Sequence, residues 1–348
     1  MGEIAYYPST YEEARTQFRQ RAIDRGGTLI ALPVNQQQEL FIDVALWEGS
    51  SKTLNIHVSG VHGVEAFPGS AVQCAFLDQW NPEQLGEDSL VLIHCVNPFG
   101  MHYLRRWNDC NIDLNRNFLQ QFDTLPANSM YQKLDTFINP QHKSQLIGFT
   151  WQALPQLLHY RFSALQQAIA QGQYDNPEGL FYGGNQPAIE VTLLLDFFRQ
   201  HLNHYTCIRG IDFHTGLGKY RRSSFYLEPD FTVFQHKQAE LLLDTSVIYG
   251  DPGRRRSYQI QGSLIAGLMR YYDEKDFLML TQEIGTVGPI RVLRALRKEN
   301  YYYHRELRIQ PEVAQQLKLA FCPDEPKWRA TAVQAGVSAL NRLVDRGE

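Results

Sequence analysis

The sequence predicts an α/β protein built on a mixed, mainly parallel central sheet with helices on both faces. Short apolar runs of strand length alternate along the chain with longer amphipathic stretches, which is typical of strand–helix–strand units. Glycine, proline and asparagine bound the apolar runs, and these residues end strands and form turns. The chain has 348 residues, 43% hydrophobic and 20% charged, so it can bury a large core.

The elements can be predicted in chain order from these patterns. Apolar runs between turn residues predict strands at 28–33, 40–46, 53–59, 90–96, 208–213, 225–227 and 277–282. Amphipathic stretches predict helices at 11–25, 68–80, 130–138, 151–171, 189–201 and 328–344. Ser9 or Thr10 can cap the first helix, and Gly26 ends it. We expect one domain over 1–348, interrupted by a helical insertion at 119–180.

Charge and composition argue against several classes of protein. The formal net charge is -4, whereas nucleic-acid-binding domains usually carry a strongly basic face. No apolar run approaches the roughly 20 residues that cross a bilayer. The first residues show no signal-peptide pattern, so we expect a cytoplasmic protein. The five cysteines are scattered and form no CxxC pair, which argues against a disulfide framework or a thiolate zinc site.

Three side chains form a candidate metal site. His62 and Glu65 stand three residues apart in a glycine-rich loop after the strand predicted at 53–59. His214 follows another predicted strand and could complete the three-ligand set of a catalytic zinc. Asp212 or a backbone carbonyl could orient its imidazole. Each of these residues, taken alone, also has a structural explanation.

Other polar residues suggest substrate binding and proton transfer. Asn115 and Arg116 lie in the segment NDCNIDLNRNF, and an amide beside a guanidinium suits a carboxylate ligand. Arg106 could place a second cation near an oxyanion. Glu283 follows an apolar strand, where partial burial would raise its pKa toward that of a general base. The alternatives are arginines in ordinary surface ion pairs and a solvated glutamate.

Four features follow one another along the chain: the His-x-x-Glu pair, the DLNRNF motif, the strand-end histidine and the strand-end glutamate. In this order they resemble the M14 zinc carboxypeptidase superfamily. Within it, the chain is most similar to the DUF2817-like group, which is related to succinylglutamate desuccinylase and aspartoacylase. The resemblance runs from about residue 53 to 305. It implies a zinc carboxypeptidase-like fold and one Zn²⁺ per chain, bound by His62, Glu65 and His214.

The resemblance also implies roles for the remaining candidates. Glu283 matches the catalytic carboxylate and Arg106 the oxyanion arginine, although the neighbouring Arg105 could take that place. The residues that match substrate-binding positions are Asn115 and Arg116, which would hold a terminal carboxylate, and Tyr258, which resembles a mobile tyrosine that caps the substrate.

These observations predict a zinc-dependent hydrolase that cleaves an amide bond next to a free carboxylate. The leading interpretation is a metallocarboxypeptidase that acts on small or C-terminal peptides. One alternative is an N-acyl-amino-acid amidohydrolase of the aspartoacylase or desuccinylase type. Another is a non-catalytic binding protein that retains the pocket. We therefore expect a small peptide or an N-acyl amino acid as substrate, and no nucleic acid or membrane partner.

Overall fold

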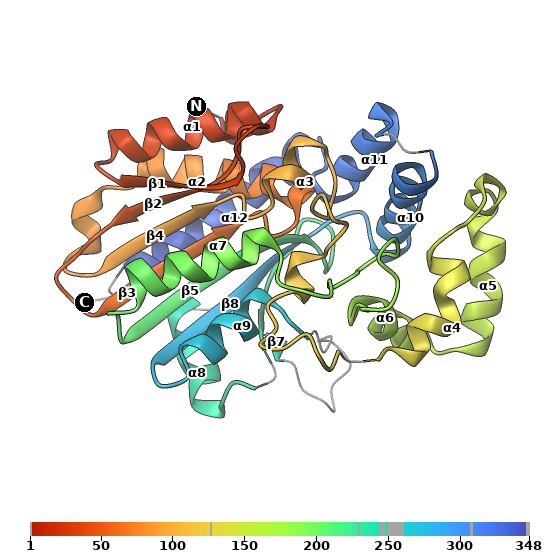
Figure 1. Cartoon of the computed structure of the whole chain (residues 1–348). Coiled ribbons are helices and arrows are strands. Elements are labelled where there is room, and N and C mark those ends of the chain that lie inside the picture. Colours follow the sequence, from red (N-terminus) through yellow and green to blue (C-terminus); the bar gives the residue numbers. More distant parts are fainter. Residues whose placement is uncertain are drawn as a thin grey trace.

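A mixed eight-stranded sheet runs through the molecule (Figure 1). The computed structural model describes residues 2–125, 127–228, 230–243, 248–249, 261–306 and 309–345. The strands, in chain order, are β1 Thr28–Asn35, β2 Leu40–Trp47, β3 Thr53–Ser59, β4 Ser89–His94, β5 Cys207–Gly216, β6 Ser223–Leu227, β7 Ile248–Tyr249 and β8 Asp276–Gly285. Their order across the sheet is β1-β2-β4-β3-β5-β8-β6-β7, which confirms the predicted fold class.

The centre of the sheet is parallel. Strands β4, β3, β5 and β8 are parallel neighbours, whereas β1 and β2 form an antiparallel pair at one side and β6 runs antiparallel to β8 at the other. The central strands are apolar and mostly buried, as expected of parallel strands that are covered on both faces. The carboxyl ends of β3, β5 and β8 therefore meet at one edge, where open α/β sheets usually bind ligands.

Helices cover both faces of the sheet. Their bounds are α1 Tyr11–Asp24, α2 Ala66–Gln79, α3 Pro98–His102, α4 Ser129–Ile138, α5 Phe149–His159, α6 Phe162–Ala170, α7 Ile189–Phe197, α8 Val233–Leu243, α9 Leu264–Tyr271, α10 Pro289–Arg305, α11 Pro311–Phe321 and α12 Pro326–Val344. Helices α1, α2 and α12 pack together on one face, and α7 and α9 lie on the other (Figure 1). No helix in the described ranges is long and apolar enough to cross a membrane.

The three helices of the insertion lie beyond the carboxyl ends of the central strands, beside α10 (Figure 1). Backbone hydrogen bonds shape the base of the insertion. Gln173 N donates to Phe181 O at 3.0 Å and Gly183 N donates to Gln173 O at 2.8 Å, which closes the loop 174–180 at the C-terminal end of the insertion. The amide of Asp113 donates to Tyr182 O at 2.7 Å. We call this base, residues 173 and 181–183 with Asp113, the neck. It joins the insertion to the DLNRNF loop.

The helix predictions hold less well than the strand predictions. The single helix predicted at 151–171 is wrong, because Tyr160 and Arg161 adopt extended backbone angles that separate α5 from α6. The helix predicted at 189–201 ends at Phe197 and continues as a π-helical turn. Helices α8 to α11 were not predicted. A start signal was present for two of them, since Pro289 and Pro311 stand in the first turn of α10 and α11.

Candidate metal centre and active site

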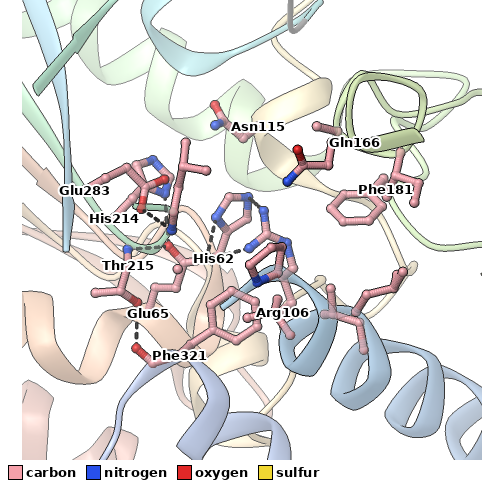
Figure 2. Close-up of a pocket in the computed structure, with 18 of the residues that line it drawn as sticks. His62, Glu65, Arg106, Asn115, Gln166, Phe181, His214, Thr215, Glu283 and Phe321 are labelled. Atoms are coloured by element: carbon pink, nitrogen blue, oxygen red, sulfur yellow. Dashed lines mark hydrogen bonds and ion pairs between the residues drawn. The ribbon is translucent and has the colours of Figure 1, made fainter. Parts of the chain in front are cut away.

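Two histidines and a glutamate converge at the edge where β3 and β5 end (Figure 2). His62 and Glu65 lie in the short turn between β3 and α2, and His214 lies near the end of β5. The Nδ1 atom of His62 lies 3.0 Å from Glu65 Oε1, and Nδ1 of His214 lies 3.1 Å from Glu65 Oε2. One potential ligand atom of each residue lies within 4.8 Å of the others, and all three side chains are buried.

Each histidine has a carboxylate on its other ring nitrogen. His62 Nε2 lies 3.0 Å from Asp113 Oδ1, and His214 Nε2 lies 2.8 Å from Asp212 Oδ2. A carboxylate in this position fixes the tautomer and the ring orientation of a metal-binding histidine. The Nδ1 atoms of both rings face Glu65. The expectation for Asp212 agrees with this contact. Asp113 was missed, although it is the aspartate of the DLNRNF motif.

The cluster fits a divalent cation. Among the described residues, His62 Nδ1 is buried and has no hydrogen-bond donor or acceptor that satisfies it, as expected of an atom that would bind a metal. Two imidazoles and one carboxylate are also a donor set of catalytic zinc sites. Burial would raise the pKa of Glu65, but the positive charges of His62 and Arg106 lower it below the ordinary value. The carboxylate is therefore held in its ionised form.

The arginine doublet separates into two environments. Arg106 Nη1 lies 2.5 Å from Glu65 Oε1, and its Nη2 lies 2.9 Å from His62 Nε2. Arg105 points away: its Nε donates to Glu299 Oε1 at 2.6 Å, and its guanidinium lies 3.3 Å from the centre of the Tyr303 ring. The structure thus brings Arg106, and not Arg105, to the cluster.

Glu283 lies beside His214 across two parallel strands. The two residues are register partners of β8 and β5, so their side chains project from the same face of the sheet. Glu283 lines the cavity next to the cluster, and Oε2 accepts a hydrogen bond of 3.1 Å from the amide of Leu217. Burial raises the pKa of Glu283 to about 8. A carboxyl group with a pKa near neutrality can take up and release a proton under physiological conditions.

Asn115 and Arg116 line the same cavity from the short helix Leu114–Arg116. The Arg116 side chain is fixed, because Nε and Nη2 both donate to Ala170 O and Nη1 donates to Asn115 O at 2.9 Å. A guanidinium has five N–H donors, so two remain for a ligand. Asn115 Oδ1 accepts from Leu264 N at 2.9 Å, which leaves its amide group. Tyr258 lies outside the described residues.

The asparagines of the DLNRNF segment hold its irregular backbone in place. Asn108 Oδ1 accepts from the amide of Ile112 at 2.8 Å. Asn117 Nδ2 donates to Gly183 O at 2.7 Å, and its Oδ1 accepts from Ala188 N at 2.7 Å. These bonds replace the ladder that a strand would supply. They fix Asp113, Asn115 and Arg116 relative to the segment that leads into α7.

The candidate site residues that the structure describes line one cavity of about 400 Å³. Two aromatic residues of its wall were not predicted from the sequence. The ring centres of Phe181 and Phe321 lie 5.5 and 5.3 Å from the guanidinium carbon of Arg106. Phe181 has a φ of 56°, which is strained for a non-glycine residue and occurs mostly where function requires it. Phe321 comes from α11, and Thr215 Oγ1 donates to its carbonyl at 2.7 Å.

Comparisons with known proteins agree with this architecture. The structure is similar to bovine thrombin-activatable fibrinolysis inhibitor, solved with tick carboxypeptidase inhibitor (TM-score 0.55, 13% identity, 97% of this chain and 96% of that chain covered). It is also similar to metallo-carboxypeptidases from Burkholderia cenocepacia (TM-score 0.51, 11% identity) and Pseudomonas aeruginosa (TM-score 0.50, 15% identity), each with 98% of this chain and 70% of that chain covered. At these identities the likeness shows the fold alone.

A comparison with curated protein sequences finds no match. Residues 7–335 match the family described as "Protein of unknown function (DUF2817)". This match spans most of the chain and includes every candidate site residue. The protein therefore belongs to the DUF2817 family and has the fold of the metallocarboxypeptidases.

Proposed function

We propose that the protein is a zinc-dependent hydrolase that cleaves an amide bond next to a free carboxylate, and that its substrates are small or C-terminal peptides. One observation carries the proposal: a cavity holds a two-histidine, one-carboxylate cluster, a separate carboxylate with a raised pKa, and two arginines. These are the groups that metal-assisted amide hydrolysis requires. The proposal extends to the roles of the individual side chains.

One zinc ion would be held by His62 Nδ1, Glu65 and His214 Nδ1. A zinc ion in such a site acidifies a water molecule and polarises a carbonyl group. Asp113 and Asp212 keep the two imidazoles oriented, and their negative charge strengthens both as donors. Glu65 remains ionised at neutral pH because its pKa is lowered.

Glu283 is the proton acceptor. It faces the same cavity as the cluster, and burial gives it a pKa of about 8, close to the value at which a base both accepts and returns a proton. In the first step it takes a proton from the attacking water. In the second step it delivers that proton to the nitrogen of the leaving amine, so that the amide bond breaks and a carboxylate and an amine are formed.

The arginines bind the substrate's negative charges. Arg106 lies against the cluster and donates hydrogen bonds to the oxygen that becomes negative in the tetrahedral intermediate. Asn115, through its amide group, and Arg116, through its two remaining N–H groups, bind the substrate's free carboxylate. This contact places the carboxylate beside the scissile bond, so that the enzyme acts at the end of a peptide.

An N-acyl-amino-acid amidohydrolase is the second candidate. It would use the same groups on an acyl amide, and the apolar residues around Arg106 favour it, because they leave room for a hydrocarbon acyl group. Hydrolysis of blocked dipeptides compared with N-acyl amino acids would separate the two.

The test combines metal analysis with this substrate panel, for the wild type and Glu283→Gln. We expect about one zinc per chain in both proteins and hydrolysis only in the wild type. A metal-replete preparation with almost no bound zinc would contradict the proposal and favour a binding protein that retains the pocket. Near-normal hydrolysis by Glu283→Gln would contradict the role of Glu283.

A further inference from the structure

The cavity has a polar end and an apolar end. The polar end contains the metal cluster together with Asn115, Glu228 and Ser263. Away from it the lining is mostly hydrocarbon and comes from two parts of the chain, the insertion and α10; Gln156 and Gln166 are the polar side chains that the insertion adds. We call six of the hydrocarbon side chains the apolar wall: Phe137, Phe149, Leu165, Ile169, Val292 and Leu293.

The apolar wall is built by packing between the insertion and α10. Phe137 and Phe149 stack with ring centres 5.5 Å apart. The buried Arg297 of α10 lies behind them, with its guanidinium carbon 4.9 Å from each ring centre. Its Nη2 donates to Gln152 Oε1 of α5 at 2.9 Å. Helix α10 and two insertion helices are thus joined in one unit, which gives the wall a defined shape.

The position of Arg106 shows which part of a substrate would meet the apolar wall. Phe181 and Phe321 flank this arginine. Leu296 and Phe321 belong to the same hydrophobic cluster as Leu165, and Ile169 and Leu293 pack against that cluster. In the proposed function Arg106 binds the oxygen of the scissile carbonyl. The group attached to that carbonyl therefore leads toward the apolar wall, whereas the amine half lies toward Asn115.

We propose that the apolar wall binds the acyl half of the substrate, and that this half carries a large hydrocarbon group. The inference rests on the proposed function and narrows its substrate class. A cavity of about 400 Å³ is within the range of small-molecule sites, which are mostly apolar with a few polar groups that set orientation. The hydrocarbon can belong to a fatty acyl chain or to an apolar residue that precedes the carboxyl-terminal one.

Binding to the Glu283→Gln protein tests the proposal without turnover. Calorimetry with zinc-loaded protein would compare acetyl-, hexanoyl- and decanoylglycine, and, in a second arm, acetylated Gly-Gly, Leu-Gly and Phe-Gly. We expect affinity to rise about threefold for each added methylene until the wall is filled, since each buried methylene is stabilising. A rise in the first arm alone identifies a fatty acyl group, and a rise in the second identifies an apolar residue. Equal affinities within each arm would overturn the proposal.

Two substitutions in the wall locate the effect. Leu293→Asp places a carboxylate in the apolar end, and Ile169→Trp fills part of it. We expect each substitution to reduce at least tenfold the increase in affinity from acetylglycine to decanoylglycine. The affinity for acetylglycine, whose acyl group is too short to reach these side chains, should stay within twofold. The matched control is Leu241→Asp, because Leu241 is 81% exposed on α8 and does not line the cavity. Thermal unfolding verifies that each variant is folded. A gain that survives both wall substitutions would overturn the proposal.

The outcomes for the two proposals are separable. Binding that depends on chain length, without hydrolysis by the wild type, would refute the proposed function and leave the apolar acyl site in place. Hydrolysis by the wild type with no dependence on the acyl group would refute only the acyl site.

Discussion

The carboxyl ends of β3, β5 and β8 and the apolar wall face each other across one cavity, but they are built differently. At the strand ends, His62, His214 and Glu283 each have a polar partner at about hydrogen-bond distance. The wall is held by packing of apolar side chains and by Arg297. Polar contacts fix atoms to within the tolerance that catalysis needs, whereas packing sets a volume. Under the two proposals, the strand ends carry out the chemistry and the wall selects the substrate.

The largest expected effect is at the strand ends. Glu283→Gln removes the proton acceptor but keeps the shape of the side chain, so we expect kcat to fall by about 10²–10⁴ for every substrate, whatever its acyl group. Steady-state kinetics and metal analysis would be measured together, and zinc content should stay unchanged. A loss confined to substrates with large acyl groups would show that chemistry and selectivity are not divided in this way.

The arginine doublet sharpens the comparison, because substitution of Arg106 should lower activity whereas substitution of Arg105 should lower stability. Arg106→Ala removes the proposed oxyanion donor, so we expect kcat of the zinc-loaded protein to fall by about 10²–10³. Arg105→Ala leaves Glu299 buried without its cation, which typically costs about 3–5 kcal/mol of folding free energy. Kinetics and urea unfolding of both variants would check this. The assignment fails if Arg105→Ala is the variant that folds normally and is inactive.

A smaller effect is expected one contact away from the metal cluster. Asp113→Asn replaces the carboxylate that orients His62, and changes of this kind lower metal affinity by about 10–100-fold. Competition with a chelator would measure the affinity. Asp109→Asn serves as the control, since Asp109 is an exposed residue of the same loop. Equal affinities in the two variants would mean that Asp113 does not support the ligand.

The last prediction concerns stability alone, at a polar contact that supports the loop before the DLNRNF motif. Burial raises the pKa of Glu190 to about 7 from 4.5, and Asn108 Nδ2 donates to its Oε2 at 3.2 Å. The folded-state pKa is the higher one, so this group's stabilising contribution is complete below about pH 4.5 and is lost as the pH rises to about 7.

Glu190→Gln keeps the neutral form at every pH. We therefore expect the variant to gain stability relative to the wild type as the pH rises above 5, with a difference on the order of 3 kcal/mol reached above about pH 7. Urea unfolding at several pH values would measure the difference, with Glu312→Gln at an exposed position of α11 as the control. A stability difference independent of pH would contradict the burial of an ionisable group at this position.

Much of the site was predictable because its chemistry follows the strands. Apolar runs of strand length located β3, β5 and β8, and His62, Glu65, His214 and Glu283 come directly after or at the ends of those runs. Parallel strands bring such positions together without any further information. The amide beside a guanidinium suggested that Asn115 and Arg116 bind a carboxylate, and the family resemblance implies the same role, which we propose.

The rest depends on tertiary packing that no local pattern contains. Arg105 and Arg106 are adjacent, and only the positions of Glu299 and Glu65 separate them. Phe321 reaches the cavity from α11, far along the chain, and nothing in its neighbourhood marks it as a lining residue. The break between α5 and α6 likewise reflects how the insertion folds back on itself.

The neck has a consequence for how this family can diversify. Because the backbone hydrogen bond from Asp113 N to Tyr182 O joins the chain before the insertion to the chain after it, the helices between these two residues can be exchanged or shortened while Asp113 keeps its anchor. The entropic cost of closing a longer or shorter segment changes slowly with length. Relatives could therefore acquire new substrate preferences by exchanging the helices of the insertion, and the same exchange could be made by protein engineering.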